Sequence, residues 1–256
     1  MVTRGPDELS QGVIVDSALP NVNPHTPAHQ RDSSGEARQH IFHFPKSSSD
    51  CQATAAWPRT HSSKKLLDLC ISLALLVLVL PLIALLALLI WSQDDGPIFY
   101  LSERIGRNGR PFTMYKFRTM IVGAELMRHS LSCRNERNAV LFKIPNDPRV
   151  TRIGRVLRKY SLDELPQLIN VIRGEMSLVG PRPPLASEVE QYSPHQFIRL
   201  KVLPGITGLW QINARKSSCF NEYIALDAAY VQNCCLWLDL KILWRTIGVV
   251  LAGTGD

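Results

Sequence analysis

The order of apolar and polar positions divides the chain into three stretches of different character. Residues 1–62 are rich in Pro, Ser, His, Gln and charged residues and show no sustained helix or strand period. Residues 69–93 carry no charge, and residues 73–91 are nearly all Leu, Ile, Val and Ala, about the length that a helix needs to cross a hydrocarbon core. We predict a disordered tail over residues 1–62, a membrane helix over residues 63–93 and a folded domain over residues 94–256.

Pro81 stands at the centre of the predicted membrane helix. It removes one backbone hydrogen bond and therefore predicts a kink. Lys64 and Lys65 precede the apolar stretch, and Arg104 and Arg107 follow it, so cations on both flanks give no clear preference for one orientation. A helix that crosses the bilayer and a re-entrant helix that bends at Pro81 both fit. We expect the re-entrant form, in which both flanks stay in the cytoplasm.

The domain that follows is predicted to be mainly helical, with one small β-hairpin. Strand-like residues 98–100 and 111–115 flank an Arg-Asn-Gly segment, and Asn-Gly favours a hairpin turn. Residues 201–211 carry the turn residues of an ordered loop. Helical spacing is expected over residues 116 to about 133, 149–160, 162–172, 185–192, 221–233 and 236–251.

The last of these helical segments is amphipathic. Its apolar side chains are interrupted by Asp239, Lys241 and Arg245, which argue against a second membrane crossing. Two tryptophans and two cations on such a helix suit the bilayer interface. Ordinary packing against a protein core fits the same pattern, and both interpretations stay open.

Charge and cysteine content limit the class of protein. The formal net charge of +7 suits an anionic membrane surface, anionic substrates or nucleic acid. No nucleic-acid recognition motif accompanies this charge, and the membrane stretch argues against a nucleic-acid binder. The six cysteines form no CxxC pair and no metal-binding spacing, so they are expected to be free thiols in a reducing compartment.

Candidate chemistry centres on residues 161–167 (SLDELPQ). Ser161 suits the N-cap of a helix, and Glu164 stands at the third helical position, which together predict a capping box. Asp163 and Glu164 would then lie at the positive end of the helix dipole, which favours their ionised forms. A capping box alone is the ordinary interpretation of such a segment, so the surrounding residues decide whether it carries chemistry.

Cations near these two acids predict a phosphate site. Arginine forks match phosphate oxygens, and carboxylates can act as nucleophile or metal ligand. Arg158 is nearest to the acids in sequence. Arg149 and Arg152 belong to a stripe that winds round a helix, so we expect them to contact solvent or lipid headgroups. The phosphate-binding candidates are Lys116, Arg118, Arg158 and Arg182.

Eight segments, taken together and in order, resemble the bacterial sugar transferase family, which comprises monotopic polyprenyl-phosphate phosphoglycosyl transferases. Each segment alone is a weak indicator, but the ordered set is highly specific. The segments are residues 64–68 (KKLLD), 96–99 (GPIF), 104–106 (RIG), 115–120 (YKFRTM), 147–151 (DPRVT), 162–167 (LDELPQ), 176–183 (MSLVGPRP) and 204–208 (PGITG).

The resemblance implies a mainly α, monotopic membrane protein with a re-entrant membrane helix hinged at Pro81, amphipathic interfacial helices and a small β-hairpin. Residues 94–256 would be a catalytic domain at the cytoplasmic face of the bacterial inner membrane. The implied reaction transfers a hexose 1-phosphate from a UDP-sugar to undecaprenyl phosphate and releases UMP. Asp163 would be the nucleophile that carries a covalent phosphosugar, with Glu164 as its partner and Mg²⁺ held by both.

The C-terminal segments narrow the resemblance to members that transfer glucose or galactose 1-phosphate to begin exopolysaccharide repeat units. Those members commonly have Gly-Arg where this chain has Ala214-Arg215, so Arg215 is a further expected phosphate-binding residue. If the glycine serves a positive φ angle, alanine weakens the site. The alternative function is a non-catalytic, membrane-anchored scaffold of a polysaccharide synthesis complex, and the intact acids and cations argue against it.

Overall fold

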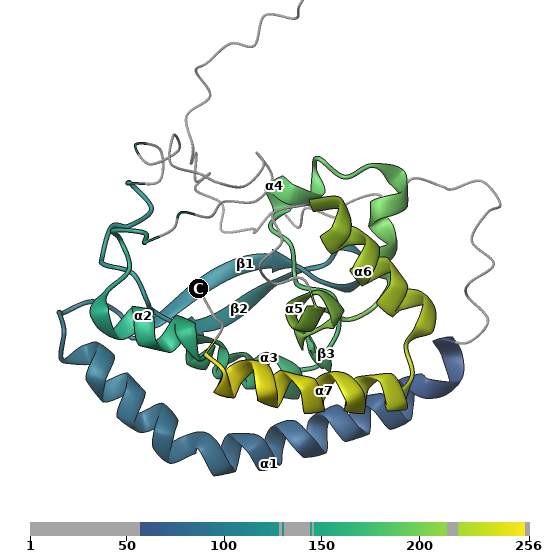
Figure 1. The fold of residues 1–256 in the computed structure, drawn as a ribbon, viewed down its shortest axis with the longest axis horizontal. Helices are drawn as coiled ribbons and strands as arrows, with labels where there is room; N and C mark the ends of the chain where they lie inside the picture. The colour runs from purple at the N-terminus through teal and green to yellow at the C-terminus, as the bar shows by residue number, and fades with distance from the viewer. Residues whose placement is uncertain (1–56, 128–129, 131–143, 145, 214–219, 254–256) are drawn as a thin grey trace, which may run out of the picture. The chain divides into compact units, whose positions relative to one another are not determined.

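A computed structural model describes residues 57–127, 130, 144, 146–213 and 220–253, with backbone alone for residues 57–61. The described residues all fall within one compact unit, residues 39–256 (Figure 1). Most of the predicted disordered tail lies outside them, so that prediction stays untested over residues 1–56.

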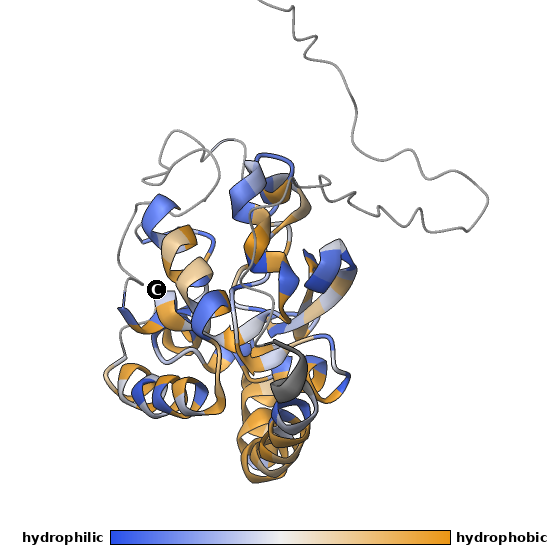
Figure 2. Ribbon diagram, turned by 90° about the vertical axis from the view of Figure 1, so that its right-hand side faces the viewer, coloured by the Kyte–Doolittle hydropathy of each residue, from blue (hydrophilic) through white to orange (hydrophobic). Residues whose placement is uncertain are grey.

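The first element, α1 (Trp57–Trp91), is a helix of 35 residues with Pro81 inside it. It begins earlier than the predicted start at residue 63. Among the described residues, residues 62–91 form the one helix that is long and apolar enough to cross a membrane, and only 11% of its most apolar window is buried in the protein. Figure 2 shows α1 as the most uniformly hydrophobic element. A core helix of a soluble protein would be mostly buried, so this exposure is consistent with membrane association.

The predicted β-hairpin is confirmed. Strands β1 (Phe99–Ile105) and β2 (Pro111–Phe117) pair antiparallel, with Phe99 opposite Phe117 and Ile105 opposite Pro111. A single 3-10 turn, η2 (Arg107–Gly109), joins them. Asn108 and Gly109 have φ angles of 57° and 73°, the left-handed conformation that Asn-Gly adopts at little cost.

A second, parallel two-stranded sheet was not predicted. It joins β3 (Ser177–Val179) to β4 (Gly205–Thr207), where the sequence predicted only an ordered loop. The two backbones approach so closely that a Cβ atom on Gly205 would lie 2.0 Å from the amide nitrogen of Gly180. Glycine at this crossing therefore allows the strands to meet.

Helices make up most of the remaining chain, as predicted for a mainly α protein. The predicted helices over residues 149–160, 185–192 and 221–233 are present with shifted ends, and the helix over residues 236–251 is present as predicted. The helical elements after the hairpin are α2 (Arg152–Lys159), η4 (Leu162–Glu164), α3 (Gln167–Ile172), α4 (Ala186–Val189), η5 (Pro194–Lys201), α5 (Leu209–Asn213), α6 (Phe220–Asn233) and α7 (Leu236–Leu251).

Two helix predictions are wrong. The segment from residue 116 does not begin a helix, because Lys116 and Phe117 belong to β2, Met120 bridges to Val150, and residues 122–127 form turns. Pairing with distant strands has overridden the local helical spacing. The predicted helix over residues 162–172 is also broken, into η4 and α3.

Three clusters of buried apolar side chains form the core. The α6 core consists of Ile105, Val189, Tyr192, Leu200, Trp210, Phe220, Tyr223 and Ile224. The central core consists of Met114, Leu168, Val171, Met176, Leu178, Val179, Tyr230 and Ile242. The site core consists of Leu86, Ile90, Phe117 and Leu157. Side chains of α1 pack against the central core through Ile71, Leu76 and Val79, and they form part of the site core through Leu86 and Ile90.

Polar contacts also fasten the first turns of α1 to the domain. Lys64 donates a 2.6 Å hydrogen bond to a carboxylate oxygen of Asp239 in α7. The hydroxyl of Ser177 in β3 donates a 2.7 Å hydrogen bond to Asp68. Both carboxylates are buried. The same folded domain therefore holds α1 near its beginning and, through the site core, near its end.

Candidate active site

The segment that carries the two candidate acids folds differently from the prediction. Ser161 has a φ angle of 55°, in the left-handed region, and its side chain makes no capping hydrogen bond. The predicted capping box with Glu164 is therefore wrong. The left-handed backbone of Ser161 turns the chain sharply after α2. The short helix η4 follows, and the amide of Glu164 donates a hydrogen bond to the backbone carbonyl of Ser161.

The structure buries Asp163, which is 9% exposed. Burial raises the pKa of this carboxyl, and the neighbouring charge of Glu164 raises it further, while the charges of Lys116 and Arg158 lower it. The helix-dipole prediction of a readily ionised acid is thus outweighed by desolvation. Asp163 and these three neighbours are called the Asp163 group.

Lys116 ties the hairpin to the acids. It lies in β2, and its Nζ atom is 2.7 Å from Oε1 of Glu164. Both side chains are partly exposed, so the ion pair can rearrange when an anionic ligand enters. Among the described residues, Asp163 itself forms no ion pair, although a lysine and an arginine act on it electrostatically.

Arg158 reaches the group from α2, as the sequence predicted. Thr151 caps this helix by accepting a hydrogen bond from the amide of Gly154. The Nε atom of Arg158 donates a 2.9 Å hydrogen bond to the hydroxyl of Thr119, which follows β2. A Cβ atom on Gly154 would lie 2.1 Å from the carbonyl oxygen of Thr119, so glycine brings α2 close enough for this contact.

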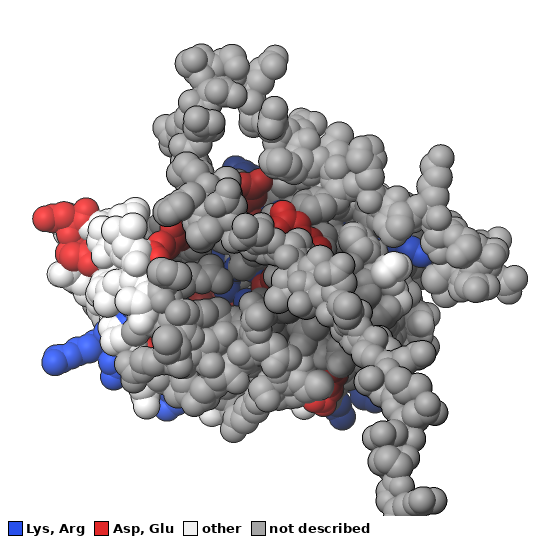
Figure 3. Space-filling model, turned by 90° about the horizontal axis from the view of Figure 1, so that it is seen from above, with Lys and Arg blue, Asp and Glu red and all other residues white. Residues whose placement is uncertain are grey.

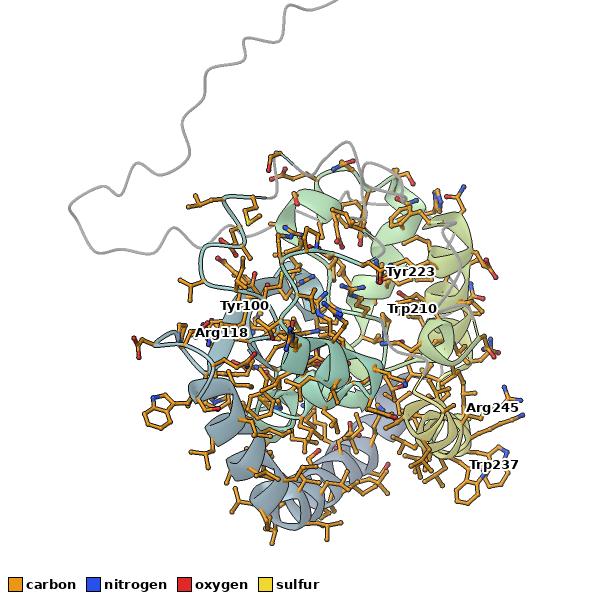
Figure 4. All side chains as sticks on the ribbon, turned by 60° about the vertical axis from the view of Figure 1, so that its left-hand side comes forward. Tyr100, Arg118, Trp210, Tyr223, Trp237 and Arg245 are labelled. Atoms are coloured by element: carbon orange, nitrogen blue, oxygen red, sulfur yellow. The ribbon has the colours of Figure 1, made fainter. Side chains whose placement is uncertain are left out.

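Arg118 has a partner that the sequence did not indicate. Its guanidinium forms an ion pair with Asp94, just after α1, and Asp94 also accepts a hydrogen bond from the amide of Gly96. These hydrogen bonds lower the pKa of Asp94. The second terminal nitrogen of Arg118 is buried without a hydrogen-bond partner among the described residues. Figure 4 shows Arg118 beside Tyr100 on the hairpin. Arg118 thus joins the end of the apolar helix to the strand that carries Lys116.

The Asp163 group stands on the second half of α1. Apolar residues next to its members, namely Phe117, Leu157, Leu162 and Leu165, belong to the site core or pack against it, together with Leu86 and Ile90 of α1. The candidate site is therefore built on the helix with the membrane-spanning composition.

Arg182 belongs to a different set of charges. Its guanidinium lies over the ring of Trp210, 5.9 Å from the centroid, and its charge acts on Arg104, Tyr223 and Asp227. These contacts are with residues outside the Asp163 group, and the phosphate-binding role of Arg182 stays a prediction. Arg215, the fifth candidate phosphate ligand, lies outside the described residues.

Beside Arg182 lies a buried cluster that the sequence did not predict, here called the Arg199 group. Arg199 donates hydrogen bonds to Asp227 at 2.6 Å, to the hydroxyl of Tyr192 at 2.5 Å and to the hydroxyl of Tyr223. It also donates to the backbone carbonyl of Arg182 at 3.0 Å. Burial raises the pKa of Asp227 to about 6 and that of Tyr223 to about 12, although Arg199 opposes both shifts.

Comparison with known proteins places the chain in a family. The family model described as bacterial sugar transferase matches residues 59–253, most of the chain. The chain belongs to the bacterial sugar transferase family. This confirms the family that the eight sequence segments predicted.

Relatives of this sugar transferase carry informative names. It is 45% identical over 203 residues to a UDP-galactose-lipid carrier transferase of Erwinia amylovora, covering 76% of this chain and 42% of the relative. It is 44% identical to the exopolysaccharide production protein ExoY of Rhizobium meliloti, covering 76% and 88%. It is 39% identical to a UDP-glucose:undecaprenyl-phosphate glucose-1-phosphate transferase of Caulobacter vibrioides, covering 73% and 69%. The chain thus spans less than half of the Erwinia protein and most of the other two.

One sequence prediction about the arginines of this sugar transferase is wrong. Arg149 was expected to contact solvent or lipid headgroups, yet it is 5% exposed and forms a 2.6 Å ion pair with Asp147. The hydrogen bonds from Arg149 lower the pKa of Asp147. Arg149 precedes α2 and turns inward, because the helix begins only at Arg152, which is exposed as expected.

A magnesium ion is expected at Asp163 and Glu164. The described residues contain no group of three or more His, Cys, Asp or Glu side chains that could form a complete protein cage. Mg²⁺ commonly takes one or two carboxylates and completes its shell with substrate phosphates and water. Asp163 and Glu164 supply two carboxylates that are adjacent in the chain and act on one another electrostatically. The residues present therefore fit a magnesium ion bound together with substrate.

Proposed function

We propose that this sugar transferase moves a hexose 1-phosphate from a UDP-sugar to undecaprenyl phosphate and releases UMP, through a covalent phosphosugar on Asp163. One observation carries the proposal: a buried carboxylate lies near Lys116 and Arg158, and its apolar neighbours in the chain pack against the second half of the apolar helix α1. The names of the relatives support a lipid-phosphate acceptor and a UDP-glucose or UDP-galactose donor.

In the first step, an oxygen of the ionised Asp163 attacks the β-phosphorus of the UDP-sugar. The bond from this phosphorus to the bridging oxygen breaks, UMP leaves with the bonding pair, and the sugar phosphate remains as an acyl phosphate. Lys116 and Arg158 stabilise the ionised carboxylate and offset the charge of the incoming phosphates. Asp163 and Glu164 would hold Mg²⁺, which would supply further charge neutralisation when bound.

In the second step, a phosphate oxygen of undecaprenyl phosphate attacks the same phosphorus. The acyl phosphate bond breaks, Asp163 returns to its carboxylate form, and undecaprenyl diphosphate sugar is produced. The acceptor phosphate is anchored in lipid, so the site must lie at the level of the headgroups. Packing of the site core against α1 supports this position.

We also propose that α1 is re-entrant, with both ends at the cytoplasmic face of the inner membrane. Lys64 and Asp68 fasten its beginning to α7 and β3, while Asp94 and Ile90 fasten its end to the hairpin and the site core. A helix that crossed the bilayer would carry one of these ends to the other side. Pro81 removes one backbone hydrogen bond at the place where the re-entrant form bends.

The reaction is tested by nucleotide release from membranes that contain the protein, Mg²⁺, a polyprenyl phosphate and UDP-glucose or UDP-galactose. We expect UMP, reduced by at least about 1000-fold in Asp163→Asn. Asp95→Asn, an exposed acid close to the site, is the matched control and should keep full activity. Release of UDP instead of UMP would overturn the mechanism.

The covalent step has its own measurement. Without acceptor, intact-protein mass spectrometry should show an added hexose phosphate on the wild-type chain and on Asp95→Asn, but not on Asp163→Asn. Full transfer by Asp163→Asn would favour another nucleophile. If no nucleotide is released from any of a wide panel of donors, the membrane-anchored scaffold is the better function.

The topology is tested by cysteine labelling from outside intact cells, after replacing the native thiols. Ser63→Cys and Asp95→Cys should both resist a membrane-impermeant reagent and become reactive once the membrane is permeabilised. Labelling at one of the two positions alone would establish a true crossing.

A further inference from the structure

One face of the hairpin carries a row of polar side chains that leads away from the Asp163 group. Strand pairing places Tyr100 opposite Lys116, and alternate residues share one face of a strand, so Ser102 and Arg104 lie on the same side as Tyr100. The Nε atom of Arg104 donates a 3.1 Å hydrogen bond to the hydroxyl of Ser102. The row starts at the lysine of the candidate active site and ends at an arginine.

At its far end this row meets Arg182. A terminal nitrogen of Arg104 donates a 3.3 Å hydrogen bond to the backbone carbonyl of Pro183, the residue that follows Arg182. Burial lowers the pKa of Arg104 to about 10, and the positive charge of Arg182 lowers it further. The two guanidinium groups thus lie close enough for their charges to repel one another, and an anion bound to both would relieve this repulsion.

The surrounding charges do not fully compensate this pair. Asp227 is bound to Arg199, and Glu188 is the acid whose charge acts on Arg104. Among the described residues, Arg182 forms no ion pair and rests on the ring of Trp210. Its backbone is nevertheless fixed, because Arg199 binds the carbonyl of Arg182. Arg182 is therefore a positioned cation that forms no ion pair in the described part of the chain, although its charge also acts on Asp227.

The setting of the pair distinguishes a water-soluble ligand from a lipid. Trp210 and the neighbouring Tyr223 belong to the α6 core, which in the described residues contains no side chain of α1. Figure 4 shows these two aromatic residues together, above the membrane helix in that view. Seen from above in Figure 3, basic and acidic atoms come to the surface close together in the middle of the face. The lipid acceptor fits the side of the domain that packs against α1. The end of the hairpin that carries Arg104 is therefore left for the water-soluble donor.

The spacing suits an elongated donor. Arg104 lies four positions after Tyr100, or about 14 Å along an antiparallel strand, and the Arg104 side chain leans back toward Ser102. This span is comparable with the length of a nucleoside diphosphate. Guanidinium planes and aromatic rings also offer stacking surfaces for a base.

We propose that Arg104 and Arg182 bind the nucleoside monophosphate part of the donor, while Lys116 and Arg158 bind the sugar phosphate that is transferred. This inference rests on the proposed function and extends it by assigning the two halves of the donor to two ends of the hairpin. After the first step, UMP remains on the Arg104 end until it dissociates.

Direct binding of UMP to the full chain in lipid nanodiscs tests the assignment without turnover. Arg182→Gln and Arg104→Gln should each weaken UMP binding by about tenfold or more. Arg110→Gln, an exposed arginine at the end of the same hairpin, should bind UMP like the wild type. Asp163→Asn should also keep UMP binding, which separates this test from that of the proposed reaction.

Two further arms decide between the sources of phosphate and guard against misfolding. A short-chain polyprenyl phosphate should bind Arg182→Gln as well as it binds the wild type. If its binding falls while UMP binding stays, the pair serves the lipid acceptor and the proposal is overturned. Arg104→Lys, which keeps the charge, should recover part of the UMP affinity, whereas loss through misfolding would lower the unfolding temperature of both arginine variants.

The same variants make a kinetic prediction. Arg182→Gln should raise the KM for the UDP-sugar more than it lowers kcat, because it removes contacts to the part of the donor that does not react. Unchanged UMP binding in both arginine variants, or absence of UMP binding to the wild type, would refute the assignment.

Discussion

The Asp163 group and the Arg199 group are both built from charged side chains, yet they pair their charges in opposite ways. Arg199 is 2% exposed, and its hydrogen bonds go to Asp227, Tyr192 and Tyr223. Asp163 is similarly buried, but among the described residues it lacks an ion pair. One group has a cation enclosed by partners, and the other has an anion that its neighbours only partly compensate.

The difference separates a structural role from a chemical one. A buried ion pair that is complete adds little net stability, but removing one partner leaves a costly buried charge. A buried acid without an ion pair destabilises the fold. Its carboxylate can bind a ligand that brings cations, or donate an electron pair to an electrophilic atom of the ligand. The comparison teaches that burial of a carboxylate alone does not mark a catalytic site, whereas its pairing helps to do so.

The largest effect on stability is expected for Asp227→Asn. It leaves the charge of Arg199 buried with neutral partners, at a cost of about 3 to 5 kcal/mol. This cost outweighs what is gained by removing a carboxyl group whose pKa is raised by burial. For a chain of this size, the unfolding temperature should fall by about 10 °C in calorimetry or fluorescence melts. Asp163→Asn is the matched control, since it removes the charge of another buried aspartate. Equal destabilisation by both changes would erase the contrast between the groups.

A smaller effect is expected for Gly154→Ala, which tests how closely α2 must approach the hairpin. The new Cβ would meet the carbonyl of Thr119 at 2.1 Å, so α2 must move away. We expect a loss of about 1 to 3 kcal/mol and a lower rate of UMP release, because the hydrogen bond from Arg158 to Thr119 stretches.

Gly248→Ala in α7 is the control for this substitution. No atom lies within 4 Å of a Cβ at that position among the described residues, so alanine should stabilise the helix by about 1 kcal/mol. Melting temperatures that move in the same direction for the two variants would mean that the close approach of α2 is unimportant.

The sequence predicted the parts of this fold that depend on neighbouring residues in the chain. Asn108-Gly109 predicted the hairpin turn, the uncharged run predicted α1, and the order of the motifs brought Lys116, Arg158 and Asp163 into one hypothesis. Each of these features is encoded within a few neighbouring residues.

The features that the sequence missed depend on contacts between distant residues. Pairing of Ser177 with Gly205 joins strands that are too short to be recognised from their pattern. The position of Arg182 depends on Arg199 in η5, which donates a hydrogen bond to the backbone carbonyl of Arg182. Arg104 could have been found earlier, because strand alternation from Tyr100 places it on the face of Lys116.

A prediction of intermediate size concerns the pH dependence of UMP release. Catalysis needs Asp163 ionised, and the charge of Lys116 lowers its pKa, whereas Glu164 raises it. Lys116→Met should therefore move the acid limb of kcat/KM to higher pH, and Glu164→Gln should move it to lower pH, each by about one unit. Residual activity from pH 4 to 8 is the measurement. Shifts in the same direction would show that another group controls the acid limb.

The smallest effect should come from the stability of Asp163→Asn itself, and its sign carries the information. Burial raises the pKa of this acid in the folded protein, so its contribution to stability is fully present below its unfolded pKa and is lost as pH rises through the folded value. Asparagine does not titrate. The variant should therefore match the wild type near pH 4 and exceed it at pH 7 to 8, by on the order of 1 kcal/mol. A variant that melts below the wild type at neutral pH would mean that the Asp163 carboxylate stabilises the fold, as the carboxylate of Asp227 does.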